Sequence, residues 1–133
     1  MSVSRVLIVE DFVPFRRLIC SLLANISNLQ VVGEASDGSE ALRKAVELKP
    51  DLILLDIGLP ILNGMEVARQ LRELVPESRI IFVTQESSSD VVEEALRIGA
   101  RGFVTKVKVG NELPAALSAV ISGQQFIAGG QPR

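Results

Sequence analysis

Short apolar runs alternate with amphipathic stretches along the whole chain. The apolar runs are bounded by polar or turn-forming residues, and we expect them to be strands at residues 5–9, 29–35, 52–56, 79–84 and 102–105. Runs of this kind are typical of strands that are buried on both faces of a sheet. The other stretches carry apolar side chains at helical spacing, which predicts helices at about residues 14–26, 41–48, 65–74, 90–98 and 112–122.

The alternation of strands and helices predicts an α/β fold with a doubly wound parallel sheet and helices on both faces. At 133 residues the chain is expected to form one domain, which we bound at residues 1–122. The last stretch, GQQFIAGGQPR at residues 123–133, is rich in Gly and Gln and shows no period. It is therefore expected to be a linker-like tail.

Composition narrows the possible functions. The chain is 47% hydrophobic and 23% charged, which is typical of a globular domain, and its net charge of −2 argues against nucleic-acid binding by the domain itself. The single cysteine, Cys20, excludes an internal disulfide and favours a reducing, cytoplasmic location. No apolar run is long enough to span a membrane. The chain contains no histidine, which excludes catalytic triads and zinc sites that use imidazole.

Polar side chains follow the ends of four predicted strands. Glu10 and Asp11 follow the first strand, Asp56 ends the third, Thr84 ends the fourth, and Lys106 follows the fifth. Because the carboxyl ends of parallel strands meet at one edge of the sheet, these side chains are expected to converge there. Each of these residues alone is explained as a cap, turn or surface residue. Their predicted convergence at one edge is therefore stronger evidence for a functional site than any single residue.

The residue types at this edge predict a chemistry. Three carboxylates repel one another, at a cost of about 4 kcal/mol for each pair at ~4 Å and an effective dielectric of ~20. A hard cation bound by oxygen ligands, such as Mg²⁺, relieves that repulsion. A metal ion, the ammonium of Lys106 and the hydroxyl of Thr84 around one carboxylate suit phosphoryl transfer onto Asp56.

At this point the sequence resembles the receiver domain of two-component response regulators, over about residues 4–122. The resemblance rests on VLIVED, LLDIGLPILNG around Asp56, FVTQ and GFVTK, in that order. It implies the flavodoxin-like (βα)5 fold with strand order 2-1-3-4-5. The ending AALSAVISGQQFIAGG further resembles receivers of the LuxR-type, or NarL/FixJ, regulators, in which a helix-turn-helix domain follows and controls transcription.

The resemblance also implies roles for the site residues. Asp56 is then the phosphoacceptor, and Mg²⁺ is bound by Asp11 directly, by Glu10 through water, by Asp56 and by the main-chain carbonyl of Gly58. The phosphoryl group is contacted by Thr84 and Lys106, and Phe103 acts with Thr84 as a switch that couples phosphorylation to the face made by helix four, strand five and helix five. The partner is a sensor histidine kinase, which must act in trans, and activation is expected to allow a homodimer. Such a domain is a signalling module that catalyses only its own phosphorylation and dephosphorylation.

Three positions depart from the usual pattern of this family. Gln85 follows Thr84 where a small residue is usual, so it is expected to crowd the phosphoryl site. Val107 follows Lys106 where many members have a cis proline, so the next loop is expected to differ in shape. Phe103 has no hydroxyl, so its inward position needs no hydrogen-bond partner.

Two other functions remain open from the residues alone. A pseudo-receiver that binds partners without being phosphorylated is supported only by Gln85 and Val107. A Mg²⁺-dependent phosphohydrolase that works through an aspartyl-phosphate usually needs a second aspartate two residues after the nucleophile, where this chain has Gly58. Arg16 and Arg17 are interpreted most simply as part of a solvated helix face.

Overall fold

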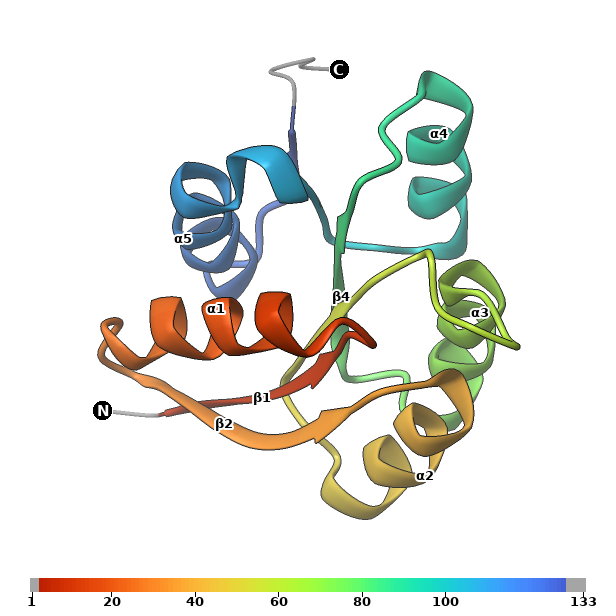
Figure 1. The fold of residues 1–133 in the computed structure, drawn as a ribbon, viewed down its shortest axis with the longest axis horizontal. Coiled ribbons are helices and arrows are strands. Elements are labelled where there is room, and N and C mark those ends of the chain that lie inside the picture. Colours follow the sequence, from red (N-terminus) through yellow and green to blue (C-terminus); the bar gives the residue numbers. More distant parts are fainter. Residues whose placement is uncertain (1–2, 129–133) are drawn as a thin grey trace.

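The structure is a computed structural model, and it describes residues 3–128. Its elements in chain order are β1 (Ser4–Val9), α1 (Val13–Ala24), β2 (Leu29–Ala35), α2 (Gly38–Leu48), β3 (Leu52–Leu55), α3 (Gly64–Leu74), β4 (Arg79–Thr84), α4 (Ser89–Ile98), β5 (Gly102–Thr105), a 3-10 turn (Lys106–Lys108), α5 (Val109–Ile121) and β6 (Phe126–Ile127). The alternation expected from the apolar pattern is thus present (Figure 1). Within residues 3–128, no helix combines the length and the apolar character needed to cross a bilayer.

The strands form one parallel sheet in the order β2-β1-β3-β4-β5-β6. The predicted flavodoxin-like fold and its order 2-1-3-4-5 are confirmed, with a sixth strand added beside β5. Two apolar cores lie on opposite faces of the sheet. One packs against α2, α3 and α4, and the other against α1 and α5, so the sheet is doubly wound (Figure 1).

Local sequence signals mark the starts of three helices. Asp37, Asn63 and Ser88 each accept a hydrogen bond from the backbone N–H three residues on, which caps α2, α3 and α4. The last helix begins at Val109, earlier than the predicted 112, because the 3-10 turn leads directly into it. Pro114 lies inside α5, and the helix continues past it to Ile121.

The tail differs from the linker expected at residues 123–133. Phe126–Ile127 forms β6, in which Phe126 N donates to the Arg101 carbonyl at 3.1 Å and Ala128 N donates to the Phe103 carbonyl at 2.8 Å. An edge strand offers unpaired backbone groups, and the tail satisfies those of β5. A two-residue strand is too short to show alternation in the sequence, which is why the pattern missed it. The rest of the predicted tail, residues 129–133, lies outside the described residues.

Candidate functional site

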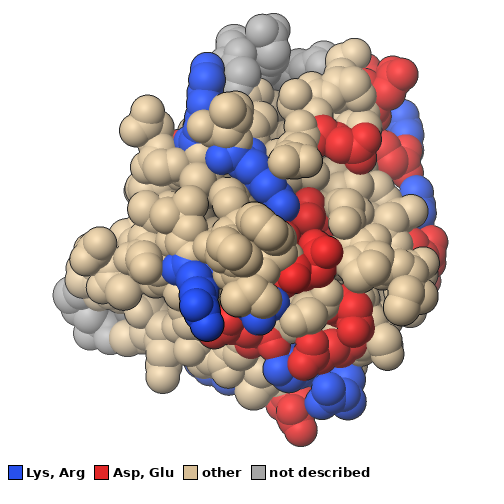
Figure 2. All heavy atoms as spheres, viewed as in Figure 1, with Lys and Arg blue, Asp and Glu red and all other residues tan. Residues whose placement is uncertain are grey.

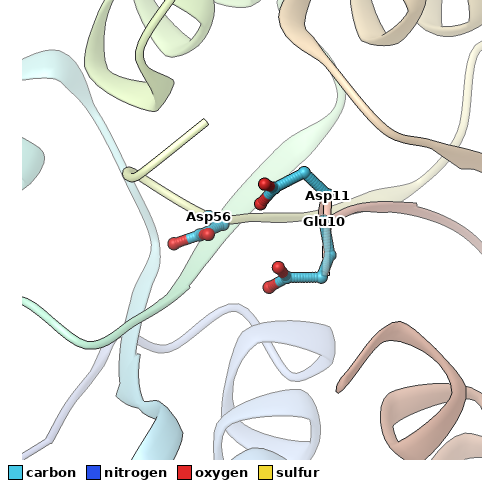
Figure 3. Close-up of side chains that lie close together, drawn as sticks. All are labelled: Glu10, Asp11 and Asp56. Atoms are coloured by element: carbon cyan, nitrogen blue, oxygen red, sulfur yellow. The ribbon is translucent and has the colours of Figure 1, made fainter. Parts of the chain in front are cut away.

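Three carboxylates converge at the carboxyl ends of β1 and β3. Figure 3 shows the side chains of Glu10, Asp11 and Asp56 close together, and one carboxylate oxygen of each lies within 4.8 Å of those of the other two. Glu10 is 1% exposed and Asp56 is 5% exposed, whereas Asp11 is open to solvent. The parallel sheet therefore brings together the acids that the sequence predicted to meet.

The backbone around Asp56 is held from both sides. Asp56 N donates to the Val9 carbonyl at 3.1 Å, which ties it to the end of β1. Gly58 N donates to Asp56 Oδ1 at 3.2 Å, so Gly58 lies beside the carboxylate. Gly64 passes so close that a Cβ there would lie 2.1 Å from the Asp56 carbonyl oxygen. Only glycine fits this approach, which fixes the loop that returns over the candidate phosphoacceptor.

Lys106 bridges two of the acids. Its Nζ lies 2.7 Å from Glu10 Oε1 and 3.2 Å from Asp56 Oδ2, and it stands 4.8 Å above the Phe15 ring. Glu10 Oε2 accepts a hydrogen bond from Phe12 N at 3.0 Å. Glu10 Oε1 has no partner among the described residues at hydrogen-bond angles, so its contact with Lys106 is an ion pair. The lysine thus lies where the sequence predicted, against the carboxylates.

Burial and charge shift two pKa values at the site. Burial raises the pKa of Glu10, and the charge of Asp56 adds to the rise, while Lys106 and the Phe12 N–H oppose it. Burial by itself would lower the pKa of Lys106, but its contact with Glu10 and the charges of Asp56 and Glu10 outweigh burial, so the pKa is raised. Lys106 therefore remains a cation at neutral pH, facing carboxylates.

Thr84 and Phe103 lie on two paired strands, Thr84 at the end of β4 and Phe103 on β5. Thr84 is buried at the end of β4, pairs with Thr105 of β5, and its Oγ1 accepts a 3.4 Å hydrogen bond from Glu86 N. Phe103 is 1% exposed and packs against Phe82 with ring centroids 6.2 Å apart. The phenylalanine therefore occupies an inward position without a polar partner. Its role as a switch and that of Thr84 as a phosphoryl contact stay predictions.

Gln85 and Val107, two of the three residues that depart from the usual family pattern, border an open cavity beside the site. They line this cavity of about 400 Å³ together with Phe12, Phe15 and Lys106. No cis peptide bond occurs within residues 3–128, and the loop after Lys106 is the 3-10 turn Lys106–Lys108. Gln85 itself is exposed. Its effect on phosphorylation stays a prediction.

Arg16 is a residue whose position the sequence did not indicate. The expected solvated face is wrong for Arg16, because its Nη1 donates to the Glu10 carbonyl at 2.7 Å and to Ser36 Oγ at 3.0 Å. Its Nε also lies 2.9 Å from Glu34 Oε1. Its side-chain partners are Glu10, just after β1, and Glu34 and Ser36 at the end of β2. The sequence pattern gave no signal for these contacts.

The donor set at this edge fits Mg²⁺. All the available ligands are oxygens, which hard cations prefer. The Lys106 ammonium contacts two of the three carboxylates, so a bound cation would offset the negative charge that Lys106 leaves at this edge.

Comparison with known proteins decides the family. The family described as "Response regulator receiver domain" matches residues 6–118. The chain belongs to this family. It is 39% identical over 124 residues to the response regulator GacA of Pseudomonas viridiflava, covering 93% of this chain and 58% of that protein. The crystal structure of a LuxR-family two-component response regulator from Aurantimonas superposes with a TM-score of 0.91 at 31% identity, over 96% of this chain and 91% of that one.

Receivers similar to this one occur in proteins with different outputs. The chain is 42% identical over 106 residues to a protein-glutamate methylesterase/protein-glutamine glutaminase of Thermotoga maritima, covering 78% of this chain and 30% of that protein. Similar receivers are thus joined both to a regulator and to an enzyme. The chain spans little more than half the length of the GacA relative.

Proposed function

We propose that this receiver is a switch in which Asp56 accepts a phosphoryl group from the phosphohistidine of a partner histidine kinase. The observation that carries the proposal is the placement of Asp56, 5% exposed, between an acid cluster and the ammonium of Lys106. The chain has no histidine, so the phosphohistidine must belong to another protein. This is the arrangement that phosphoryl transfer needs, because catalysis of that reaction rests on positioning and charge neutralisation.

Mg²⁺ would be held by Asp11 and Asp56, by Glu10 through water, and by the carbonyl of Gly58. When bound, the ion supplies positive charge to the phosphoryl oxygens. The acid cluster supports this ligand set, and the hydrogen bond from Gly58 N keeps that residue beside Asp56.

The transfer is written as an in-line displacement. An oxygen of the Asp56 carboxylate attacks phosphorus, a P–O bond forms, the P–N bond of the phosphohistidine breaks, and the imidazole leaves with the bonding electron pair. Lys106 and Thr84 contact the transferred phosphoryl oxygens. Dephosphorylation is attack of water on phosphorus, which returns the carboxylate and inorganic phosphate. The chain thus catalyses its own modification and acts as a signalling module.

The signal passed on by this receiver would depend on β4 and β5, the strands that follow β3 in the sheet. Phosphorylation draws Thr84 toward Asp56, and buried Phe103 adjusts with it, which changes the face made by α4, β5 and α5. This face, or a homodimer formed on activation, passes the signal to an effector that controls transcription, as the resemblance to LuxR-type regulators implies. We expect the protein to act in the cytoplasm, because a single cysteine fits a reducing compartment. The proposed kinase partner is consistent with this location.

The test is phosphorylation by a small donor. The chain is incubated with acetyl phosphate and Mg²⁺, and its intact mass is measured. Wild type and Asp51→Asn are expected to gain one phosphoryl group, whereas Asp56→Asn gains none. Asp51 is a matched control because it flanks the other end of β3, where it accepts a hydrogen bond from Arg5 N.

The alternatives have distinct outcomes in the same experiment. A wild-type chain that gains no phosphoryl mass under any Mg²⁺ concentration is a pseudo-receiver, and the proposed switch is wrong. Rapid turnover of many phosphate esters identifies a phosphohydrolase instead. Such hydrolases usually have a second aspartate at the position of Gly58, so we do not expect rapid turnover of phosphate esters.

A further inference from the structure

We propose that Arg16 is a positioning residue for the metal-binding acids Glu10 and Asp11. The inference rests on the proposed Mg²⁺ site but adds a residue outside the ligand set. Arg16 stands in the first turns of α1, and its side chain is 16% exposed. From there it reaches the end of β1, the end of β2 and the turn before α2, which are the segments that border the acids.

The decisive contact is with a backbone carbonyl. β1 ends at Val9, and Glu10 N makes a last sheet-like bond to the Ala35 carbonyl at 2.9 Å. The Glu10 carbonyl lies beyond that last bond and accepts the 2.7 Å hydrogen bond from Arg16 Nη1. Because a peptide unit is planar, fixing this carbonyl also fixes the amide of Asp11. The bond therefore holds the Asp11 Cα, the atom from which the side chain leaves the backbone.

Arginine suits this position for a geometric reason. Its planar guanidinium presents several N–H groups in fixed directions, so one side chain holds three acceptors. Here those acceptors are the Glu10 carbonyl, Ser36 Oγ and Glu34 Oε1, at 2.7, 3.0 and 2.9 Å. Lysine offers one nitrogen and cannot span them. Since the Arg16 charge is already paired with Glu34, its main contribution to the acids is position.

Arg17 provides the matched control. It is the next residue of the same helix, carries the same charge, is exposed, and makes none of the Arg16 contacts. Loss of Arg17 therefore removes one positive charge from the same turn of α1 without releasing the Glu10 carbonyl. A difference between the two variants reports the contacts of Arg16.

The experiment is a calorimetric titration of the full chain with MgCl₂. Partners that orient metal ligands commonly change affinity by about 10-fold to 100-fold when removed. Arg16→Ala is expected to weaken Mg²⁺ binding by about 10-fold or more, and Arg16→Lys is expected to weaken it by a smaller factor. Arg17→Ala is expected to bind like wild type. Circular dichroism without Mg²⁺ checks that each variant is folded. If Arg16→Ala does not fold, the Mg²⁺ affinity of Arg16→Lys tests the proposal.

A second readout separates positioning from general damage. In acetyl phosphate reactions, the half-saturating Mg²⁺ concentration of the Arg16 variants should rise, while the rate at saturating Mg²⁺ returns to the wild-type value. Wild-type affinity in Arg16→Lys, or equal weakening in Arg17→Ala, overturns the inference, because charge alone would then account for the effect. If wild type itself does not bind Mg²⁺, the proposed metal site fails, which is a different result from the failure of Arg16 alone.

Discussion

At the scale of single residues, the site concentrates unfavourable charge and balances it with one lysine. Glu10 is almost fully buried, and burial is the main cause of its raised pKa. A carboxylate that resists ionisation in the fold lowers stability at neutral pH. It also forms a ready cation ligand, because a metal relieves the same cost. Glu10 is therefore expected to lower stability when no cation is bound and to favour cation binding.

Glu10→Gln is expected to raise the free energy of unfolding in Mg²⁺-free buffer at pH 7, by on the order of 1 kcal/mol, the usual size of a single-residue effect. The folded pKa of Glu10 lies above its ordinary value of 4.5, so the stability that its protonation contributes is present below that value and is lost as pH rises through the folded pKa. The difference between the variant and wild type should therefore shrink in acid. Urea denaturation between pH 4 and 8 measures it.

The matching control is Glu77→Gln, which neutralises an exposed glutamate. It should leave stability within about 0.5 kcal/mol of wild type, as for most surface changes. Added Mg²⁺ should stabilise wild type more than Glu10→Gln, since a ligand that binds only the folded state stabilises it. A Glu10→Gln protein that is less stable than wild type without Mg²⁺ would show that the ion pair with Lys106 outweighs burial.

Gly64 is the second residue with a specific physical requirement. An added Cβ would lie 2.1 Å from the Asp56 carbonyl oxygen and 2.6 Å from the Ile57 Cα, both backbone atoms that cannot move aside cheaply. Gly64→Ala is expected to cost about 1–3 kcal/mol or more, as for overpacking in a dense region. It should also slow phosphorylation by acetyl phosphate, because the displaced backbone carries Asp56.

Gly110→Ala is the control for Gly64→Ala. A Cβ at Gly110 meets nothing within 4 Å, and the residue lies in the first turn of α5. Replacement of a glycine where alanine fits is expected to stabilise a protein by about 0.4–1 kcal/mol. Urea denaturation of both variants compares them directly. Equal stabilities of the two alanine variants would mean that the loop over Asp56 is not as closely packed as the structure shows.

At the scale of elements, the sequence predicts the five longer strands well and misses the short sixth one. β2, β4 and β5 have the predicted bounds, and β1 and β3 differ from the prediction by one residue at one end. The approach of Lys106 to Asp56 follows from the direction of parallel strands. The contacts of Arg16 and the pairing of β6 depend on tertiary geometry that leaves no period in the sequence.

Strand β6 has a measurable consequence for the edge of the sheet. Truncation after Ser122 removes two hydrogen bonds to the carbonyls of Arg101 and Phe103, which together contribute roughly 1–3 kcal/mol. It also leaves β5 as an open edge, which favours self-association. The shortened chain is expected to have a lower unfolding free energy and a larger sedimentation coefficient at high concentration. Truncation after Ala128 keeps β6 and should behave like the full chain.

At the scale of the whole molecule, the fold brings residues from both ends of the chain to one face. The acids follow β1 and β3, while Lys106 follows β5. In the view of Figure 2, Lys and Arg atoms lie beside Asp and Glu atoms near the middle of the molecule. The tail then returns to the outer edge of β5. This topology links Asp56, the proposed phosphoacceptor, through β4 and β5 to β6.

The link runs through paired backbone groups. Thr84 pairs with Thr105 on β5, Phe103 lies two residues earlier on the same strand, and the Phe103 carbonyl accepts the Ala128 N–H. A shift of Thr84 toward a phosphorylated Asp56 therefore acts on the strand that holds β6. Ile127 packs against the core cluster that contains Phe103, so a change at that ring also reaches the tail.

Phosphorylation is accordingly expected to change hydrogen exchange of the Phe126 and Ala128 amides, which donate to the Arg101 and Phe103 carbonyls. We expect exchange to become several-fold faster, because strain on β5 weakens both bonds. NMR detects it after addition of acetyl phosphate and Mg²⁺, with Asp56→Asn as the control. Amides of β2 should keep their rates, since this strand lies at the far edge of the sheet, beyond β1. Unchanged exchange at both tail amides, in a sample whose mass shows phosphorylation, would mean that the switch does not reach β6.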